Sequence, residues 1–180
     1  MGAPQHIRAV SASEPDWARE KMPGNFAPSR YMLGAIRDYQ RFAERRGPIA
    51  WALRRWNVVL HRFWSLVCGA EIPINTAIGG GLILPHPNGV IINYQTVIGP
   101  NCLVMQQVTL GVGGLLPGAP ILGGHVDVGA GAKILGGVRL GDHCRVGPNA
   151  VVLEDVPPGA TVVGVPARVI SCPENGFDEW

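Results

Sequence analysis

The sequence is poor in charged residues and has no uninterrupted apolar run long enough to cross a bilayer. Only 16% of its 180 residues are charged and 47% are hydrophobic, so a sizeable core can form. The longest apolar stretch, residues 49–68, is broken by three arginines and His61, which argues against a transmembrane span. The polar start of the chain, residues 1–13, has no secretory signal pattern.

Cysteine is scarce as well. The four cysteines form no CxxC pair and show no spacing typical of a disulfide framework. Free thiols fit a reducing compartment, and with no signal pattern at the start we expect a cytoplasmic protein.

Residues 1–69 are basic and predict an α-helical region. They hold 11 of the 15 Lys and Arg but only five of the 13 Asp and Glu. Such basic residues can bind nucleic acid, anionic lipid or an acidic cofactor, although we favour the interpretation that they form a solvent-exposed helical face. Helical spacing predicts one helix over residues 29–46, ended by Gly47, and a second over residues 49–68, opened by Pro48. The second helix is rich in tryptophan and arginine and could lie on a membrane, but we expect it to pack on its own domain.

Beyond residue 70 the pattern changes to a six-residue repeat, which marks a repeat architecture. An aliphatic residue recurs at this period, often followed by glycine, at Ile72, Ile78, Leu84, Val90, Ile98, Val104, Leu110, Leu122, Val128, Ile134, Leu140, Val146 and Val152. Each unit is one short strand and a corner, and three units close one turn of a triangular coil. The fold class is therefore mainly β, a parallel β-helix of about five coils over residues 70–170 behind a short helical region.

A second position supports this prism, because the residue two before each aliphatic one is usually small or slim. Cys102 and Cys144 fall there and are expected to be core residues rather than nucleophiles. The repeat slips by two residues between Val90 and Ile98, which predicts an irregular corner. The Gly- and Pro-rich segment at about 112–121 is expected to leave the prism as a loop, where function tends to sit. A short tail is expected at residues 171–180.

These repeats resemble the hexapeptide-repeat acyltransferase superfamily, and within it the serine O-acetyltransferases. The similarity rests on LPHPNGVIIN around His86, QQVTLG at 106–111, the stretch from GAGAKILGG to GVPAR at 129–168, and Glu71. It implies a left-handed β-helix, trimers or dimers of trimers, active sites between neighbouring prisms, and acetyl-CoA as acyl donor. It also implies a histidine base oriented by an aspartate 15 positions earlier. Here His86 matches the base, and Glu71 stands at the position of the aspartate.

Acetyl transfer to a hydroxyl needs a base, a stabilised oxyanion and two substrates held end to end. His86 suits the base because imidazole titrates near neutral pH, and Glu71 can fix its tautomer. The alternative is that His86 is a corner histidine and Glu71 a carboxylate at the helix exit. His125 is a less favoured second base. The other histidines are expected at surface or structural positions: His6, His61 and His143.

The resemblance implies that the pantetheine arm of coenzyme A lies along a strip of small residues in the groove between prisms. The strip comprises Gly111, Gly113, Gly129, Ala130 and Ala132, each of which could equally be a plain turn residue. Lys133 and Arg168 could meet the phosphates of coenzyme A, or be solvated charges. No metal is expected.

The sequence departs from the serine acetyltransferase pattern where those enzymes hold serine. They have Asp before the histidine base and an Arg-His pair in the loop, whereas this chain has Pro85 and a shorter loop without Arg or His. The short helical lead-in also resembles the acetyltransferases of bacterial exopolysaccharide clusters. The acceptor is therefore a small molecule with a hydroxyl, either serine or a sugar.

Two other classes fit the sequence less well. A zinc hydratase of the γ-carbonic anhydrase kind needs three converging histidines, and His86, His125 and His143 are not convincingly spaced for that. A non-catalytic trimeric scaffold would not bind acetyl-CoA. No nucleic acid partner is expected.

Overall fold

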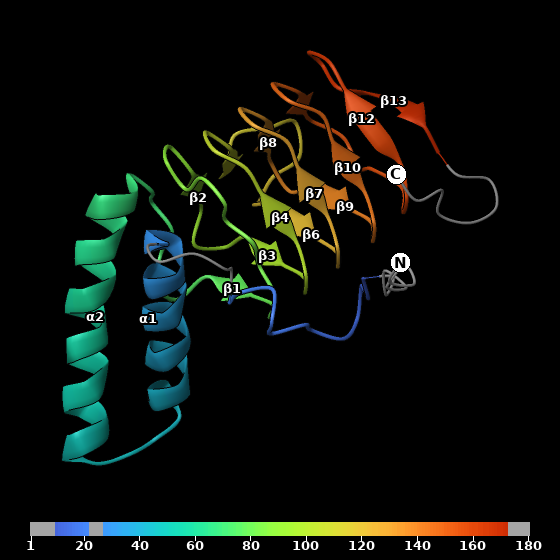
Figure 1. Cartoon of the computed structure of the whole chain (residues 1–180). Helices are drawn as coiled ribbons and strands as arrows, with labels where there is room; N and C mark the ends of the chain where they lie inside the picture. Colours follow the sequence, from blue (N-terminus) through green and yellow to red (C-terminus); the bar gives the residue numbers. More distant parts are fainter. Residues whose placement is uncertain (1–9, 22–26, 173–180) are drawn as a thin grey trace, which may run out of the picture.

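The computed structural model describes residues 10–21 and 27–172, which form a helical hairpin at one end of a stack of triangular coils (Figure 1). Helix α1 (Pro28–Ala43) packs against helix α2 (Pro48–Cys68). Pro48 opens α2 as expected, because its fixed φ suits the first helical turn. Gly69, at φ 60°, ends α2 in the left-handed conformation of a helix cap. His6 and most of the expected tail lie outside the described residues.

Short strands from each coil pair with the strands above and below them, which makes three walls. The β1 sheet contains β1 (Ala77–Ile78), β3 (Val97–Ile98), β6 (Ile121–Leu122) and β9 (Arg139–Leu140). The β4 sheet contains β4 (Leu103–Val104), β7 (Asp127–Val128), β10 (Arg145–Val146), β12 (Thr161–Val163) and β13 (Arg168–Ser171). The β2 sheet contains β2 (Ile91–Ile92), β5 (Thr109–Gly111), β8 (Lys133–Leu135) and β11 (Val151–Val152). All pairs are parallel except β12 with β13, so the described part of the repeat is a parallel β-helix.

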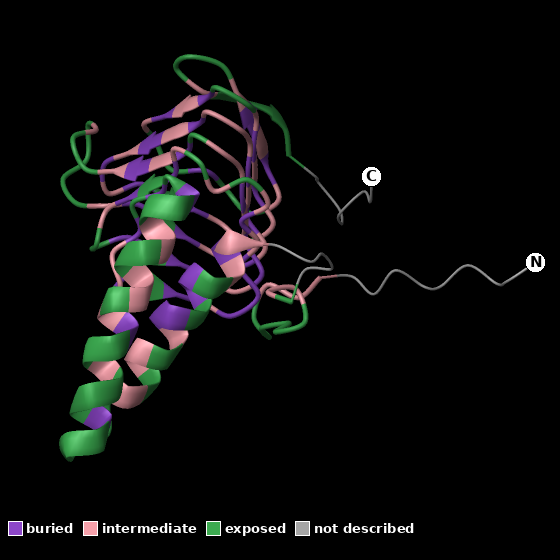
Figure 2. Ribbon diagram, turned by 60° about the vertical axis from the view of Figure 1, so that its left-hand side comes forward, coloured by how far each residue is buried: buried purple, intermediate pink, exposed green. Residues whose placement is uncertain are grey.

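The core fills the inside of the prism, where Figure 2 shows the buried residues. All the aliphatic positions of the predicted repeat are buried, and so are the small residues two positions before them. Cys102 and Cys144 are among these, which confirms them as core residues. Each inward residue stacks on its equivalent one coil away, as Leu110 does on Ile134.

The predicted position of the irregular corner is wrong. The coil that runs from Ile83 to its partner Leu103 is two residues longer than the coil from Ile91 to its partner Thr109. The two extra residues therefore lie between residues 84 and 91, in the corner that contains His86. Val90 and Ile92 are both aliphatic and two positions apart, so the sequence could not tell which one heads the next strand.

Residues 112–120 leave the prism between β5 and β6, at the edge where the β2 sheet meets the β1 sheet. Leu115, near the middle of this loop, is 75% exposed. The coils on either side of the loop still stack, because Val97 pairs with Ile121, the first residue after it.

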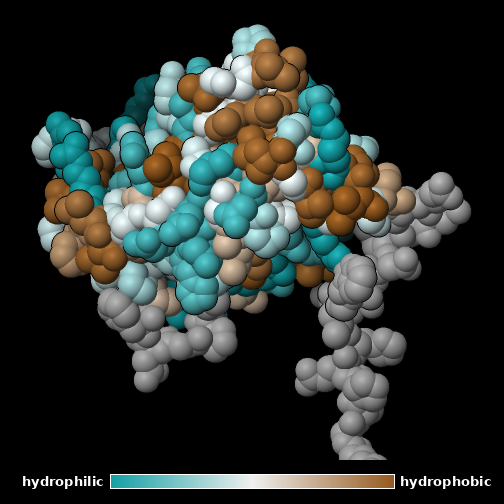
Figure 3. Space-filling model, turned by 90° about the horizontal axis from the view of Figure 1, so that it is seen from above, coloured by the Kyte–Doolittle hydropathy of each residue, from teal (hydrophilic) through white to brown (hydrophobic). Residues whose placement is uncertain are grey.

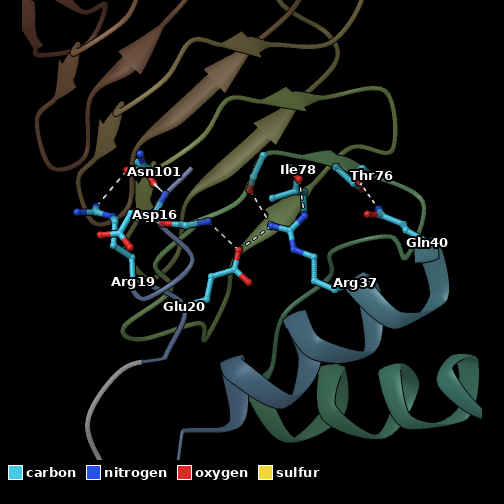
Figure 4. Close-up of polar contacts among 10 residues, drawn as sticks. Asp16, Arg19, Glu20, Arg37, Gln40, Thr76, Ile78 and Asn101 are labelled. Atoms are coloured by element: carbon cyan, nitrogen blue, oxygen red, sulfur yellow. Dashed lines mark hydrogen bonds and ion pairs between the residues drawn. The ribbon is translucent and has the colours of Figure 1, made fainter. Parts of the chain in front are cut away.

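A segment preceding the helices, residues 10–21, lies along the edge between the β1 and β4 sheets (Figure 4). The side chain of the fully buried Asn101 accepts from the N–H of Asp16 at 2.7 Å and donates to the carbonyls of Ser11 and Glu14. Arg19 donates to the carbonyl of Asn101 at 3.0 Å. We call residues 10–21 the strap, since it binds one edge of the prism.

The helical hairpin is joined to the first coil by side chains of α1. Arg37 donates to the carbonyls of Ile78 and Gly79 and to Glu20 of the strap, at 2.8 Å for Glu20. Gln40 donates to the carbonyl of Thr76 at 3.0 Å. These contacts fix α1 against the first coil, and α2 lies on the outer side of α1 (Figures 1 and 4).

We expected the tryptophan-rich helix α2 to pack on its own domain, and only one face of the helix does so. In α2, the buried residues are Ala50, Asn57 and Cys68, which share one face. Most of the tryptophans and aliphatic residues of α2 are exposed, and Figure 2 draws its outer side largely green. Within the residues that the structure describes, no helix is long and apolar enough to cross a membrane.

Candidate functional site

The irregular corner presents His86 to solvent on a restrained piece of backbone. Pro85 and Pro87 flank His86 and fix their own φ angles, and the imidazole is exposed. The N–H of Gly89 donates to the carbonyl of Gly69, the cap of α2 just below, at 2.7 Å. The carbonyl of Asn88 accepts from the N–H of Gln107 in the coil above, at 2.9 Å. The corner is therefore held at both levels of the stack although it is two residues longer than its neighbours.

Glu71 lies beside the strand that follows this corner. Its N–H donates to the carbonyl of Val90 and its carbonyl accepts from the N–H of Ile92, at 2.8 and 2.9 Å. The carboxylate is exposed, and no hydrogen bond or ion pair joins it to His86 in the described part of the chain. Glu71 pairs with Ile91 of the next coil in a parallel β-bridge. Because the enlarged corner adds two residues to this coil, the pairing partner lies farther along the chain from His86 than it would in a coil of 18 residues.

A cavity of about 750 Å³ lies between the C-terminal half of α2 and the first coil, next to Glu71. Its lining includes Glu71, Ile91 and Gly89, which belongs to the corner of His86. The helix contributes Arg62 and Leu66. The cavity thus has a carboxylate, a cation and an apolar wall, and through Gly89 it reaches the corner that carries His86.

Glu71 extends the β2 sheet by one residue, through its bridge to Ile91. The outward side chains along this sheet stack in one row, which includes Glu71, Ile91, Thr109 and Lys133. The ammonium of Lys133 donates to the carbonyl of Gln107 at 2.6 Å. Gly111 lies at the end of the same sheet, level with Leu135. The wall that carries Glu71 thus also carries two of the residues expected to contact the cofactor.

The other residues of the expected strip have different surroundings. A side chain at Gly113 would meet no atom within 4 Å, so this glycine borders open space. A Cβ at Gly129 would lie 2.7 Å from the backbone of Pro148, so this glycine is needed for stacking. Ala130 is half-buried at the same corner, whereas Ala132 is fully buried with its N–H and carbonyl bonded inside the prism. Of these four residues, Ala132 is fully buried, whereas Gly113, Gly129 and Ala130 each keep some exposed surface.

Arg168 lies on β13 at the end of the stack farthest from the helices (Figure 1). Its guanidinium is exposed, donates to the carbonyl of Ala167 at 2.9 Å, and lies 3.9 Å from the carboxylate of Glu154. It is therefore separated from His86 by most of the height of the prism.

His125 and His143 lie on the edge between the β1 and β4 sheets, and not on the edge of His86. Their Nδ1 atoms are 2.8 Å apart and their rings meet edge to face. Burial lowers the pKa of His125, an effect opposed by the nearby carboxylate of Asp127 and reinforced by His143. Within the chain these two histidines do not converge with His86. Over the described residues, no group of three or more His, Cys, Asp or Glu is placed to hold a metal ion.

The buried cysteines lack the character of nucleophiles. Burial raises the pKa of the Cys102 thiol to about 12 and that of Cys144 to about 11, so neither forms thiolate near neutral pH. His61 is structural as expected, since its Nε2 lies 2.8 Å from the carbonyl of Ile72 and burial lowers its pKa.

The sequence reasoning missed two features of the fold. The cavity wall formed by Arg62 and Leu66 depends on how α2 meets the first coil, which no motif records. Asn101 was also missed. Its only signal is an asparagine directly before a core cysteine, at a corner where the equivalent residues are glycine or histidine.

Comparison with known proteins agrees with this architecture. The family model "Bacterial transferase hexapeptide (six repeats)" matches residues 119–154. The serine acetyltransferase of Helicobacter pylori J99 is 46% identical over 114 residues, which is 62% of this chain and 67% of that protein. A probable serine acetyltransferase of rice is 35% identical over 178 residues, which is 94% of this chain and 57% of that protein.

Solved structures extend the similarity to the fold. The Brucella abortus serine acetyltransferase in complex with coenzyme A superposes with a TM-score of 0.70 at 28% identity, covering 85% of this chain and 59% of that one. The chain spans about half the length of most curated relatives it matches, for example 47% of the Synechococcus elongatus enzyme. The expected fold, a left-handed parallel β-helix behind a short helical region, is confirmed. This chain belongs to the serine acetyltransferase family of hexapeptide-repeat proteins.

Proposed function

We propose that the chain is an acetyl-CoA-dependent O-acetyltransferase that works like a serine acetyltransferase. The observation that carries the proposal is the enlarged corner, which exposes His86 between two prolines at the edge of the β2 sheet. Glu71, Gly111 and Lys133 belong to this same sheet and its extension. The names of the relatives support the reaction class.

In this proposal one imidazole nitrogen of His86 takes the proton of the acceptor hydroxyl as its oxygen attacks the thioester carbonyl. Glu71 accepts a hydrogen bond from the other nitrogen and stabilises the imidazolium. When the tetrahedral intermediate collapses, the C–S bond breaks and the coenzyme A thiolate receives the proton from His86. The products are the acetyl ester and free coenzyme A.

Coenzyme A would lie parallel to the axis of the prism, across successive coils, from the corner of His86 toward Arg168. Each coil advances by about 4.8 Å, the spacing of neighbouring strands, so an extended arm can pass several coils. Gly111, Gly113, Gly129 and Ala130 would border the arm, while the buried Ala132 holds the backbone of the strip in place. Lys133 and Arg168 are the cations proposed for the phosphates.

Serine is the acceptor that the family suggests, and one observation favours a second candidate, a sugar hydroxyl. The exposed loop at residues 112–120 has no Arg, Lys or His to bind a carboxylate, and Pro85 stands before the histidine. A carboxylate held without a cation loses hydration at a cost, whereas a neutral sugar does not. Arg62, which lines the cavity beside Glu71, is a candidate for compensation.

Thiol release from acetyl-CoA, measured against serine and a panel of sugars, tests the proposal. Turnover with any hydroxyl acceptor supports an O-acetyltransferase, and the preferred acceptor decides between the two candidates. If acetyl-CoA fails to bind in a titration, the chain is a scaffold and the proposal is wrong.

We further propose a trimer, or a dimer of trimers, in the reducing cytoplasm. The exposed β2 sheet gives coenzyme A only one wall, and a neighbouring prism would supply the other. Light scattering at micromolar concentration checks this, since a monomer would leave the groove open.

A further inference from the structure

Helix α2 carries an exposed apolar stripe on a side other than the one that it buries. Near the C-terminal end of the helix, Leu66 of this stripe also borders the cavity beside the first coil. We define the α2 stripe as Ile49, Leu53, Trp56, Val59, Phe63, Leu66 and Val67, which follow one another at spacings of three or four residues, with Leu66 and Val67 adjacent. Such spacing puts them on one face of a helix. They are 36% to 84% exposed, and Leu66 is the most exposed. In the view from above, Figure 3 shows hydrophobic surface at the left edge, the side on which Figure 1 draws the helices.

The charged residues of α2 itself are all positive. Helix α2 has three arginines and no Asp or Glu over its 21 residues. Arg55 and Arg62 lie seven residues apart and so share one flank of the stripe, as does Trp51, whose ring faces the guanidinium of Arg55 at 5.7 Å. Where α1 leads into α2, three exposed arginines, Arg41, Arg45 and Arg46, outnumber one exposed acidic residue, Glu44.

This distribution identifies the chemistry of the occupant. If α2 packed on α2 of a second copy through a two-fold axis, each arginine flank would meet another without any acidic residue of α2 to pair with it. An anionic lipid surface suits both the apolar stripe and the arginines, because acyl chains contact the stripe and the anionic headgroups pair with the arginines. The exposed Trp51 and Trp56 have the amphipathic rings that prefer the boundary between headgroups and acyl chains. We propose that α2 lies in the plane of an anionic membrane surface and anchors the protein there without spanning it.

The test is flotation of the full chain with vesicles of phosphatidylcholine, or of phosphatidylcholine mixed with phosphatidylglycerol. We expect binding to the mixed vesicles that weakens as salt is raised. The double variant Trp56→Ser/Phe63→Ser should bind roughly tenfold or more weakly, since less apolar surface enters the bilayer. Arg55→Gln should weaken binding about fivefold, the effect of about 1 kcal/mol per basic residue at such a surface.

Ile170→Ser is the matched control, because Ile170 is 64% exposed on β13 at the other end of the prism. It should bind like the unaltered chain. Failure to bind either vesicle overturns the proposal, as does equal binding by Trp56→Ser/Phe63→Ser. A stripe variant that instead splits a larger assembly in light scattering, without vesicle binding by the unaltered chain, would assign the stripe to a second copy. The readout does not depend on acetyl transfer, so the two proposals succeed or fail separately.

Discussion

The Nδ1 atoms of His125 and His143 lie 2.8 Å apart on successive coils, so at most one of the two nitrogens carries a proton in this geometry. Both residues have left-handed backbone conformations, with φ of 53° and 60°, and their rings meet edge to face. The pair links two coils on the edge opposite to the β2 sheet.

We expect this pair to make the fold sensitive to mild acid. Burial lowers the pKa of His125 below its ordinary value of 6.5, so the unfolded chain binds a proton more readily than the folded one. The free energy of unfolding should therefore be level above about pH 6.5 and fall as the pH drops toward the lowered pKa. His61 acts in the same direction, because burial lowers its pKa too. Denaturation of the unaltered chain and of His125→Asn over a pH series isolates the pair. Parallel stability curves would contradict the prediction.

Asn101 should hold the strap to the prism. Asn101→Gly keeps the left-handed backbone, at φ 61°, but leaves the N–H of Asp16 and two strap carbonyls without their partner. We expect a loss of about 1–3 kcal/mol in unfolding free energy and faster tryptic cleavage at Arg19 and Lys21. Asn149→Gly is the control, because Asn149 has the same backbone conformation, at φ 55°, on another edge. Equal cleavage of both variants would show that the strap is held by other contacts.

His86→Ala should lower turnover by roughly 10²–10⁴-fold, the usual contribution of a general base, with little change in the affinity for acetyl-CoA. Steady-state thiol release and a separate acetyl-CoA titration measure the two effects. His143→Asn, on the other edge, serves as the histidine control. Unchanged turnover with lost acetyl-CoA binding would make His86 a ligand contact instead of the base.

The KM for serine should lie well above about 1 mM, the upper end of the ordinary range, because the loop at residues 112–120 offers the carboxylate no cation. The double variant Leu115→Arg/Leu116→His supplies a cationic pair in the loop and should lower this KM. Ile170→Arg adds a charge elsewhere and should not. A micromolar KM in the unaltered chain would show that another cation, such as Arg62, binds serine.

The repeat could be predicted residue by residue because burial inside a narrow prism tolerates few side chains. The inward positions follow from the six-residue period alone, down to the two core cysteines. The position of the enlarged corner could not be predicted, since Val90 and Ile92 both fit an inward position and only the strand pairing separates them. That difference matters because the extra residues lie beside His86.

The helical region shows the opposite case. The starts of both helices were predicted to within a residue from Pro48 and the apolar spacing, yet the face that α2 buries was not. A stripe of large apolar residues normally indicates the core side, but α2 buries its alanine, asparagine and cysteine instead. Sequence periodicity identifies an amphipathic helix without identifying what covers its apolar side.

The loop at residues 112–120 has a consequence for how this chain tolerates insertions. The coil from Ile98 to its partner Leu122 is longer than the next coil, from Leu122 to its partner Leu140, by one repeat unit of six. That surplus equals one side of the triangle. Had those residues entered the wall as a strand, every later residue would have rotated by one side, and Lys133 would have left the row of Glu71 and Thr109. Later strands therefore keep their walls only if an insertion adds a multiple of three repeat units or leaves the prism as a loop. This chain does the second.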